Sequence, residues 1–208
     1  MNKRVLIVDD HPIICAAAKT VLEENGYEAV ATCSDGFEAL SLIQSLAPEY
    51  LLLDIGINSL DGLSLLQRIV ADEIEIKTLV FTSHLASTYA VRCMQAGAQG
   101  FINKNADLKE LIKGFNALSD GYLYFPKEVL TLYRDATKNN NSGTFETLTN
   151  KEIIILQQLA KGFSNQEIAA KLNLSNKTIS GHKVNLLKKL GVRTSIELAS
   201  IAKERGLL

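Results

Sequence analysis

Tyr50-Leu51-Leu52-Leu53-Asp54 is the stretch that decides the fold, because it is an apolar run that ends directly on a carboxylate. Three consecutive leucines predict a buried strand. Taken alone, Asp54 is explained equally well as a cap on the following loop, since Asp is a common turn residue. In an open parallel sheet, however, ligands collect at the carboxyl ends of the strands. The residues at the other strand ends therefore decide between the two interpretations.

Three further apolar runs also end on polar side chains. The run 4–8 is followed by Asp9 and Asp10, the run 79–81 by Thr82, and the run 100–102 by Asn103 and Lys104. With Asp54, these ends carry three carboxylates, a hydroxyl and an ammonium. Such a set at one edge of a parallel sheet predicts a site for a cation and a phosphoryl group.

Apolar strands alternate with amphipathic helices over residues 1–120. We expect helices over about 12–25, 36–46, 63–70, 88–95 and 107–118. Pro12 suits a first helical turn, and Asp35 and Asp107 are predicted caps. Five such units predict an α/β domain with a flavodoxin-like, doubly wound, five-stranded parallel sheet in the order 2-1-3-4-5. That order brings the ends of the first and third strands together.

Helices alone are predicted from residue 147 onward. Capping boxes at 149–152, 164–167 and 194–197 precede apolar runs, and Ser175 is a predicted cap for a helix over 176–190. A short helix, a brief turn and a longer helix describe a helix-turn-helix. We therefore expect a small all-α domain of four helices. The residues expected to face its core are Ile153, Ile154, Leu156, Leu159 and Ala160 in the first helix, and Ile179, Leu186, Leu187 and Leu190 in the third.

Charge divides the chain in the same way. Residues 1–134 carry 17 acidic and 11 basic side chains, whereas residues 147–208 carry 4 acidic and 10 basic ones. An acidic front and a basic back indicate domains with different partners, and the basic one indicates nucleic acid. We expect a phosphoacceptor domain over 1–121, a connecting helix and flexible linker over 122–146, and a DNA-binding domain over 147–208. Tyr122, Tyr124 and Phe125 are expected to close the first domain as an aromatic patch.

The bulk composition excludes several classes of protein. Apolar residues make up 47% of the 208-residue chain, which excludes global disorder. Cys15, Cys33 and Cys93 are widely spaced and contain no CxxC metal motif, so we expect three small buried hydrophobes. No apolar run approaches the roughly 20 residues that a membrane span needs. Residues 1–4 lead into a strand instead of a signal peptide, and we expect a soluble, cytoplasmic protein.

The predicted strand-end site has a definite chemistry. Asp9, Asp10 and Asp54 would bring three negative charges into one pocket, and a divalent cation relieves their repulsion. Oxygen ligands alone favour Mg²⁺, which also accepts phosphate oxygens. Asp54 suits the nucleophile that forms an aspartyl phosphate. Thr82 can hydrogen-bond a phosphoryl oxygen, and Lys104 can pair with the developing charge.

Two groups of motifs resemble a known family. The motifs of the first half are Val8-Asp9-Asp10-His11-Pro12, Leu53-Asp54 with Asp61-Gly62, Thr82, and Ala96-Gly97-Ala98-x-Gly100-Phe101-x-x-Lys104. They resemble those of the receiver domain of two-component response regulators. Residues 162–169, 174–179 and 189–192 resemble the LuxR-type helix-turn-helix. The chain as a whole resembles a NarL/FixJ-type response regulator, within it the BvgA/EvgA subgroup.

The resemblance implies a phosphorylation-gated transcription factor. It implies Asp54 as the phosphoacceptor, Lys104 as the phosphate partner, and Thr82 with Phe101 as the switch pair. The implied Mg²⁺ ligands are Asp9, Asp10, Asp54 and the carbonyl of Gly56. The implied partners are a sensor histidine kinase, promoter DNA, RNA polymerase and a second copy of the chain after phosphorylation. The only chemistry implied is the phosphorylation and dephosphorylation of Asp54, so the chain is not expected to be an enzyme.

The helix over 176–190 is the one expected to contact DNA. The resemblance implies that Ser180, Gly181 and Val184 face bases, because the N-terminal part of a recognition helix enters the major groove. His182 and Lys183 are expected to supplement these contacts, and the net basic charge of the domain favours phosphate contacts by the lysines of the helix. The remaining predicted DNA-binding residues are Lys177, Thr178, His182, Lys183, Lys188 and Lys189. Surplus apolar residues over 196–202 indicate a homodimer surface on the last helix.

Two positions depart from the family pattern. Asn58 stands where the family usually has Pro, which bears on the stiffness of the loop after Asp54. Asn105 follows Lys104 in place of a Pro, a variation common in this subfamily. Neither position carries the predicted chemistry.

Two other functions are weighed against this one. An aspartyl-phosphate phosphatase of the haloacid dehalogenase type also begins with Asp after a strand, but it needs a second Asp where this chain has Gly56. The basic helical half argues against that enzyme as well. A DNA-binding regulator with a phosphate-independent receiver is the third interpretation. The intact site argues against it, with all five of its residues present: Asp9, Asp10, Asp54, Thr82 and Lys104.

Overall fold

The computed structural model describes residues 3–57, 59–127, 129, 131, 148–204 and 207. The chain divides into two compact units, Met1–Tyr133 and Arg134–Leu208. Among the described residues, no helix combines the length and the apolar character that crossing a membrane requires.

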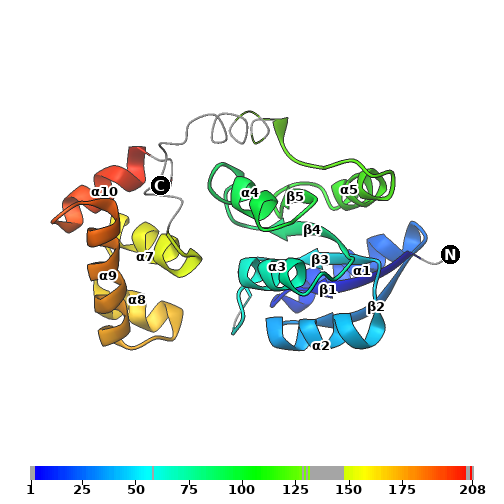
Figure 1. Ribbon diagram of the computed structural model, residues 1–208, viewed down its shortest axis with the longest axis horizontal. Coiled ribbons are helices and arrows are strands. Elements are labelled where there is room, and N and C mark those ends of the chain that lie inside the picture. Colours follow the sequence, from blue (N-terminus) through cyan, green and yellow to red (C-terminus); the bar gives the residue numbers. More distant parts are fainter. Residues whose placement is uncertain are drawn as a thin grey trace. The chain divides into compact units, whose positions relative to one another are not determined.

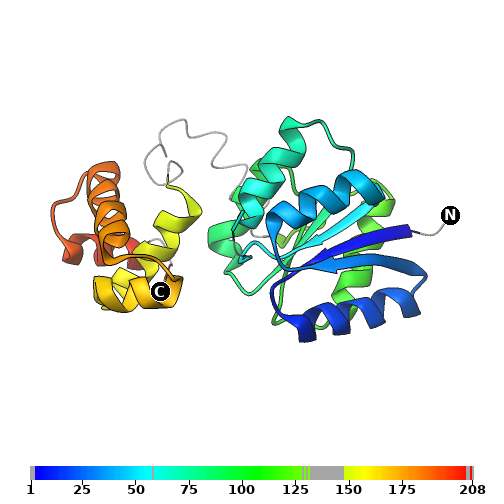
Figure 2. The same cartoon turned by 90° about the horizontal axis from the view of Figure 1, so that it is seen from below.

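The first unit alternates strands and helices, and its five strands form one parallel sheet in the order β2-β1-β3-β4-β5. The predicted doubly wound fold is therefore confirmed (Figure 1). In Figure 2 the dark-blue helix α1 and the light-blue helix α2 lie on opposite sides of the sheet. The elements are β1 (Lys3–Val8), α1 (Pro12–Glu24), β2 (Tyr27–Cys33), α2 (Gly36–Leu46), β3 (Tyr50–Leu53), α3 (Gly62–Ala71), β4 (Lys77–Thr82), α4 (Ala86–Gln95), β5 (Gly100–Asn103) and α5 (Lys109–Ser119).

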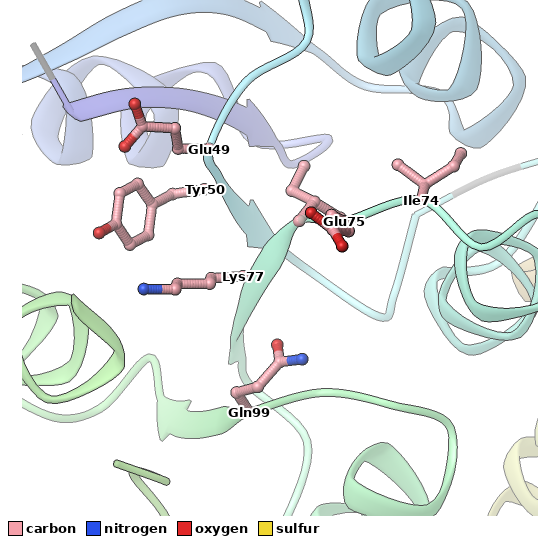
Figure 3. A pocket seen from close by; sticks show the side chains of 7 residues that line it. Glu49, Tyr50, Ile74, Glu75, Lys77 and Gln99 are labelled. Atoms are coloured by element: carbon pink, nitrogen blue, oxygen red, sulfur yellow. The ribbon is translucent and has the colours of Figure 1, made fainter. Parts of the chain in front are cut away.

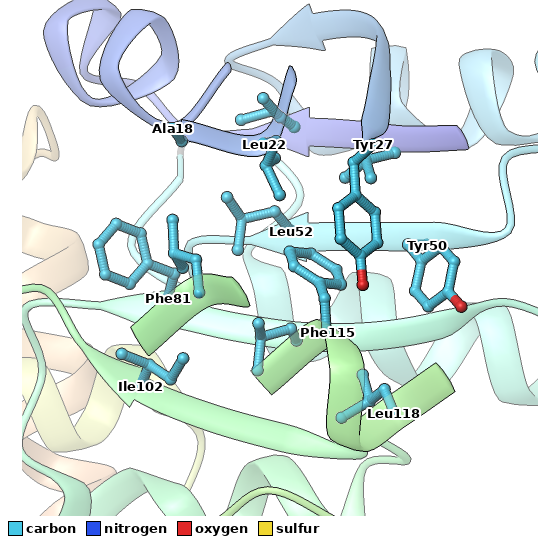
Figure 4. Close-up of a cluster of buried hydrophobic side chains, with 13 residues drawn as sticks. Ala18, Leu22, Tyr27, Tyr50, Leu52, Phe81, Ile102, Phe115 and Leu118 are labelled. Carbon is cyan, nitrogen blue, oxygen red and sulfur yellow. The ribbon is translucent and has the colours of Figure 1, made fainter. Parts of the chain in front are cut away.

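The run that predicted the fold is buried on both faces. All four residues of β3 are buried, as expected of a central strand in a parallel sheet covered by helices on each side. A large core cluster lies on the face covered by α1 and α5 (Figure 4). Tyr27, Tyr50 and Phe115 meet within it, with ring centroids 5.4 to 5.7 Å apart. Aromatic pairs at such distances add to the stability that burial of apolar area provides.

Asp107 caps the start of α5, as predicted: its carboxylate accepts a hydrogen bond from the backbone N–H of Lys109 at 2.9 Å, and Leu108 between them already has helical dihedral angles. Another local prediction in this unit is wrong. Tyr122 does not close the domain, because it is 71% exposed. Tyr124 does contact the sheet: its carbonyl accepts from the N–H of Phe101 at 2.8 Å. Its hydroxyl also donates to Glu110.

The connection between the units falls largely outside the described residues. Lys127, Val129 and Thr131 are helical, as predicted for a helix over 127–134, and Val129 is buried. The predicted linker over 136–144 lies outside the described residues.

The described part of the second unit consists of four helices, as predicted: α7 (Asn150–Ala160), α8 (Asn165–Leu172), α9 (Asn176–Leu190) and α10 (Ser195–Glu204). The first two capping boxes are confirmed, from Thr149 to Glu152 and from Ser164 to Glu167. The third differs, because the Glu197 carboxylate accepts from the N–H of Arg193 instead of that of Thr194. Ser175 caps α9 through the N–H of Thr178, as predicted.

The apolar faces of these helices differ in part from the prediction. In α7, Ile155 is fully buried, whereas Ile154 and Ala160 are only half-buried. Three consecutive isoleucines gave no basis for choosing which two face inward. In α9, Ile179 and Leu186 are fully buried, but Leu187 and Leu190 are half-buried. The inward stripe of α9 is therefore narrower than its composition indicated.

Candidate functional site

The carboxyl ends of β1 and β3 place two carboxylates side by side. The two strands are neighbours, with Val8 opposite Leu53, and the N–H of Asp54 donates to the carbonyl of Val8 at 2.8 Å. Asp9 and Asp54 are 5% and 4% exposed, so both are buried. The carboxylate of Asp10 remains partly open to solvent, with 28% of its side chain exposed.

Lys104 brings the opposite charge to the two buried carboxylates. Its Nζ lies 2.5 Å from Oδ2 of Asp54 and 2.7 Å from Oδ2 of Asp9, and its side chain is 9% exposed. The backbone N–H of Lys104 donates to the carbonyl of Thr82 at 2.8 Å, which fixes the loop after β5 beside β4. Burial disfavours the charge on Lys104, but hydrogen bonds and attraction from Asp54 and Asp9 outweigh it and raise its pKa.

The loop after Asp54 is held by two glycines. The N–H of Gly56 donates to Oδ1 of Asp54 at 2.9 Å. A Cβ at Gly62 would lie 2.6 Å from the carbonyl oxygen of Asp54 and 2.6 Å from Cα of Ile55, so no side chain fits there. Asp61 caps α3 through the N–H of Ser64. The Asp61-Gly62 pair therefore starts α3 directly against the backbone of Asp54.

The acidic cluster suits a hard divalent cation. One ligand atom from each of Asp9, Asp10, His11 and Asp54 lies within 4.8 Å of all the others. Carboxylate oxygens are the donors that Mg²⁺ takes in proteins. His11 was not among the predicted ligands, and its Nδ1 lies 2.7 Å from Oδ1 of Asp10 and 3.2 Å from Oδ1 of Asp9. Its position next to Asp10 in the chain was the available signal.

The two predicted switch residues are both fully enclosed. Thr82 is 0% and Phe101 is 1% exposed. The hydroxyl oxygen of Thr82 accepts from the N–H of His84 at 3.3 Å. The structure thus places Thr82 on the strand beside Asp54 and Phe101 on the next strand, with Val80 opposite Phe101.

His84 and Tyr89 form a further part of this region that the sequence did not indicate. Their ring centroids are 4.6 Å apart, and burial lowers the pKa of His84 despite the attraction of Asp54. Tyr89 is 1% exposed, and within the described part of the chain its hydroxyl has no hydrogen-bond partner. The sequence did not single out Tyr89, because the state of a buried hydroxyl depends on its tertiary contacts.

The cysteines behave mostly as predicted. Cys33 and Cys93 are buried, while Cys15 is only half-buried and its thiol donates to the carbonyl of Asp9 at 3.4 Å. Burial raises the pKa of Cys33 to about 11. All three thiols are free.

The pocket drawn in Figure 3 lies away from this site. Its volume is about 440 Å³, and it is lined by Glu49, Tyr50, Ile74, Glu75, Ile76, Lys77 and Gln99. These residues stand at or just before the amino ends of β3, β4 and β5. The pocket is therefore at the opposite edge of the sheet from Asp54 and takes no part in its chemistry.

Helix α9 presents the predicted DNA-binding residues unequally. Lys177, Thr178, Gly181, Val184 and Lys188 are exposed, and Val184 is 62% exposed. Ser180, His182, Lys183 and Lys189 are half-buried. The described helix therefore carries an open surface around Gly181 and Val184, with Lys177 and Lys188 toward its two ends.

Two of the half-buried residues bond to other helices. Nδ2 of Asn165, at the start of α8, donates to the hydroxyl oxygen of Ser180 at 3.1 Å. Nζ of Lys189 lies 2.8 Å from Oε2 of Glu152, which is 3% exposed. Burial disfavours the charge on Glu152, but hydrogen bonds from Lys189 and Thr149 outweigh it and lower its pKa.

Comparison with known proteins matches both units to established families. The model described as the response regulator receiver domain matches residues 5–116, and that of the bacterial regulatory proteins of the luxR family matches residues 146–202. The virulence factors putative positive transcription regulator BvgA of Bordetella pertussis (strain Tohama I) is 37% identical over 100% of both chains. The Fimbriae Z protein of Escherichia coli (strain K12) is 35% identical over 96% of this chain and 95% of its own.

Two solved structures are similar to nearly the whole chain. A structure of the RcsB response regulator of Salmonella typhimurium is 28% identical, with a TM-score of 0.62 over 97% of this chain and 100% of that one. A complex of the response regulator RcsB with DNA is 28% identical, with a TM-score of 0.60 over 96% and 97% of the two chains.

Fold, strand-end site and helical unit together define a two-component response regulator, a phosphorylation-gated DNA-binding regulator of transcription. Within this class, the chain belongs to the NarL/FixJ-type regulators, which join a receiver domain to a LuxR-type helix-turn-helix.

Proposed function

We propose that Asp54 accepts a phosphoryl group from a sensor histidine kinase and that this raises the affinity of the chain for promoter DNA. The observation that carries the proposal is the position of Lys104, whose Nζ bonds Asp54 and Asp9 together at the carboxyl ends of adjacent strands. A buried carboxylate beside a fixed ammonium is suited to phosphoryl transfer, in which catalysis is mostly positioning and charge stabilisation. The phosphoacceptor role falls on residues 1–121 and DNA binding on residues 147–208, joined by residues 122–146.

Each residue of the site has a separate role in this proposal. Asp54 attacks phosphorus through a carboxylate oxygen while the bond from phosphorus to the kinase's histidine nitrogen breaks and the histidine leaves. Lys104 pairs with the charge on the transferred group. Asp9, Asp10, Asp54 and the carbonyl of Gly56 would hold Mg²⁺, which when bound offsets the negative charge of the phosphoryl oxygens. The chain acts on no separate substrate, so its chemistry is limited to gain and loss of phosphate at Asp54.

Thr82 and Phe101 would transmit the event. A phosphoryl group adds about −1.5 to −2 charges and strong acceptor oxygens. The hydroxyl of Thr82 leaves the N–H of His84 and donates to the phosphoryl group, and Phe101 turns into the vacated space. The result is a shift between two existing conformations of the receiver.

DNA binding is assigned to α9. Ser180, Gly181 and Val184 would face bases, and Lys177, Lys183 and Lys188 would contact phosphates, with Thr178 and His182 beside them. Lys189 is the weakest of the proposed phosphate contacts, because its ammonium already bonds Glu152. Substitution of the base-facing residues should change which sequence is preferred, whereas substitution of the phosphate-contacting lysines should weaken binding to all sequences alike.

We also propose that the active form is a homodimer that reads inverted half-sites about one helical turn apart. Ile196 on α10 is 83% exposed, and Ala199, half-buried and three residues further on, lies beside it on the helix surface. This apolar pair supports a surface that a second copy covers. The cytoplasm is the proposed location, and RNA polymerase is the proposed downstream partner. Both proposals follow from the regulator class.

A phosphatase function lacks support from a specific observation. Gly56 remains where a phosphatase of the haloacid dehalogenase type needs a second Asp, and the matched relatives are transcription regulators. A receiver that ignores phosphate is likewise disfavoured by the bonded set of Asp9, Asp54 and Lys104.

The experiment that tests the proposal is labelling with a small-molecule phosphodonor in the presence of Mg²⁺, followed by DNA binding. The wild type should take up one phosphoryl group and bind promoter DNA more tightly. Asp54→Asn should lose both responses. Asp107→Asn is the matched control, since Asp107 is an exposed carboxylate on the loop after β5. Undiminished labelling of Asp54→Asn would show that another residue is the phosphoacceptor.

A further inference from the structure

A hydrogen bond between α8 and α9 determines whether the hydroxyl of Ser180, a predicted base-contacting group, is left to act as a donor or as an acceptor. Nδ2 of Asn165 donates to the hydroxyl oxygen of Ser180 at 3.1 Å. A serine hydroxyl has two acceptor lone pairs but only one hydrogen to donate. Because Asn165 uses an acceptor position, the hydrogen of Ser180 is left for another partner.

Ser180 lies at the boundary between the packed and open faces of α9. It is half-buried, and the preceding residue, Ile179, is fully buried. Lys177 and Val184, three residues before it and four after it, are its neighbours on the helix surface, and both are exposed. Its hydroxyl can therefore bond Asn165 on one side and reach the open face on the other.

We infer that Asn165 is a specificity-determining positioning residue, which holds Ser180 as a hydrogen-bond donor toward a base in the major groove. The inference rests on the proposed DNA-binding function of α9. In the major groove, guanine offers N7 and O6 as acceptors, adenine offers N7 and thymine offers O4, whereas cytosine offers only a donor. A serine held as a donor selects against cytosine at the position that it contacts.

Asn165 carries this role from outside the recognition helix. It is the first residue of α8, directly after the Ser164 cap, and belongs to the capping-box segment. The bonds between Ser164 and Glu167 do not involve the side chain of Asn165. Replacing Asn165 therefore leaves the start of α8 capped, and the effect on Ser180 can be measured in a folded protein.

The test is selection of bound duplexes from a random pool, with the full chain at one fixed salt concentration. The wild type should show one base position at which cytosine is excluded. Ser180→Ala and Asn165→Ala should weaken the preference at that same position by roughly two- to tenfold, the effect of a single hydrogen bond. The double variant should lose no more of the base preference than Ser180→Ala alone, because the two residues act through one hydroxyl.

Asn165→Asp is the sharper variant. A carboxylate only accepts, so it reverses the bond: Ser180 donates to residue 165 and presents lone pairs to the DNA. The preference at that position should move toward cytosine, whose N4 amino group is a donor. Asp is favourable in the first turn of a helix, so α8 is retained. Gln166→Ala, at an exposed neighbouring position, is the control and should alter binding to all sequences alike.

Each outcome decides the matter. Helical content and melting temperature of every variant are measured by circular dichroism, so that loss of folding is detected. The inference is wrong if Asn165→Ala keeps the wild-type base preference while Ser180→Ala loses it. It is also wrong if Asn165→Ala lowers binding equally for every sequence. In either case, Asn165 is only a packing residue. A wild type that selects no sequence contradicts the proposed function itself, which is a separate result.

Discussion

The ammonium of Lys189 lies 2.8 Å from the carboxylate of Glu152, joining the end of α9 to the start of α7. Glu152 is 3% exposed, and the backbone and hydroxyl of Thr149 also donate to it. The neighbouring Lys188 is exposed. Two adjacent lysines, both predicted to contact DNA, therefore stand in different surroundings.

Lys189→Ala should destabilise the second unit, whereas Lys188→Ala should leave its stability unchanged and weaken DNA binding for all sequences. Removing one partner of a buried ion pair costs about 3–5 kcal/mol. We expect roughly half of that here, because the Lys189 side chain is 34% exposed and Thr149 still bonds Glu152. Urea unfolding followed by circular dichroism measures the loss.

The tyrosines separate the two units in this measurement. All six tyrosines lie within residues 1–133, so tyrosine fluorescence follows the first unit alone. Any loss of the helical circular dichroism signal that occurs before the tyrosine fluorescence changes therefore reports unfolding of the second unit. Equal stability of Lys188→Ala and Lys189→Ala would show that Lys189 does not stabilise the second unit.

Acid should weaken the second unit through Glu152. The pKa of Glu152 is lowered in the folded state from its ordinary value of 4.5. A carboxyl group with a lowered folded pKa contributes its full stability above the unfolded pKa and loses it as the pH falls through the folded value. Between about pH 5 and pH 3, wild-type stability should therefore fall more steeply than that of Glu152→Gln, which cannot titrate. Parallel slopes for the two proteins would contradict this assignment.

Mg²⁺ should raise the melting temperature of the first unit, because a ligand that binds only the folded state stabilises it by mass action. Asp10→Asn should remove most of that rise. In the absence of Mg²⁺, the variant should be no less stable than the wild type, since Asp10 adds a third negative charge beside Asp9 and Asp54, the two carboxylates that Lys104 pairs. Glu24→Gln, at an exposed position on α1, should respond to Mg²⁺ as the wild type does.

Tyr89→Phe should stabilise the first unit by about 1 kcal/mol, because it removes a buried hydroxyl that has no partner among the described residues. Tyr27→Phe is the matched control. The hydroxyl of Tyr27 is also largely buried but donates to Oδ1 of Asn116 at 3.0 Å, so its loss should destabilise. Thermal unfolding of both variants gives the two signs. A destabilising Tyr89→Phe would show that this hydroxyl finds a partner in solution.

Thr82→Ala should uncouple the two halves of the chain. Asp54 should still be labelled, because Lys104 and the acidic residues remain, but DNA affinity should no longer rise with phosphorylation. Thr78→Ala is the control: Thr78 is a buried threonine near the start of the same strand, and its loss should leave the response intact. Light scattering of the phosphorylated proteins shows whether dimer formation is lost as well.

The sequence predicted the fold well where a local pattern has one physical meaning. The leucines of β3 and the Asp35 cap of α2 are examples, since strand burial and helix capping depend on neighbouring residues. The site also followed from the strand ends, because parallel strands collect their carboxyl ends at one edge. Asp9, Asp54 and Lys104 were predictable in this way without knowing any distance, whereas His11 and His84 were not.

What the sequence left open depends on contacts between distant residues. Lys189 looked like any exposed lysine until Glu152, 37 positions earlier, was placed beside it. Asn165 looked like an ordinary helix start, and its bond to Ser180 spans 15 positions. Tyr89 lies in the core, and its hydroxyl lacks a partner among the described residues, a result that depends on every element packed around it. Such relationships are set by tertiary structure alone.

The segment around Tyr124 has a practical consequence. Strand β5 is the last in the sheet, and Tyr124 forms a bridge beside Gly100, with backbone hydrogen bonds to Gln99 and Phe101. A receiver fragment cut after Gly121 would lose that cover and expose the polar backbone of an edge strand, which invites pairing with another molecule. Fragments intended for solution work should therefore retain Tyr124 and the buried Val129 beyond it. Shorter ones are expected to aggregate for reasons unrelated to phosphorylation.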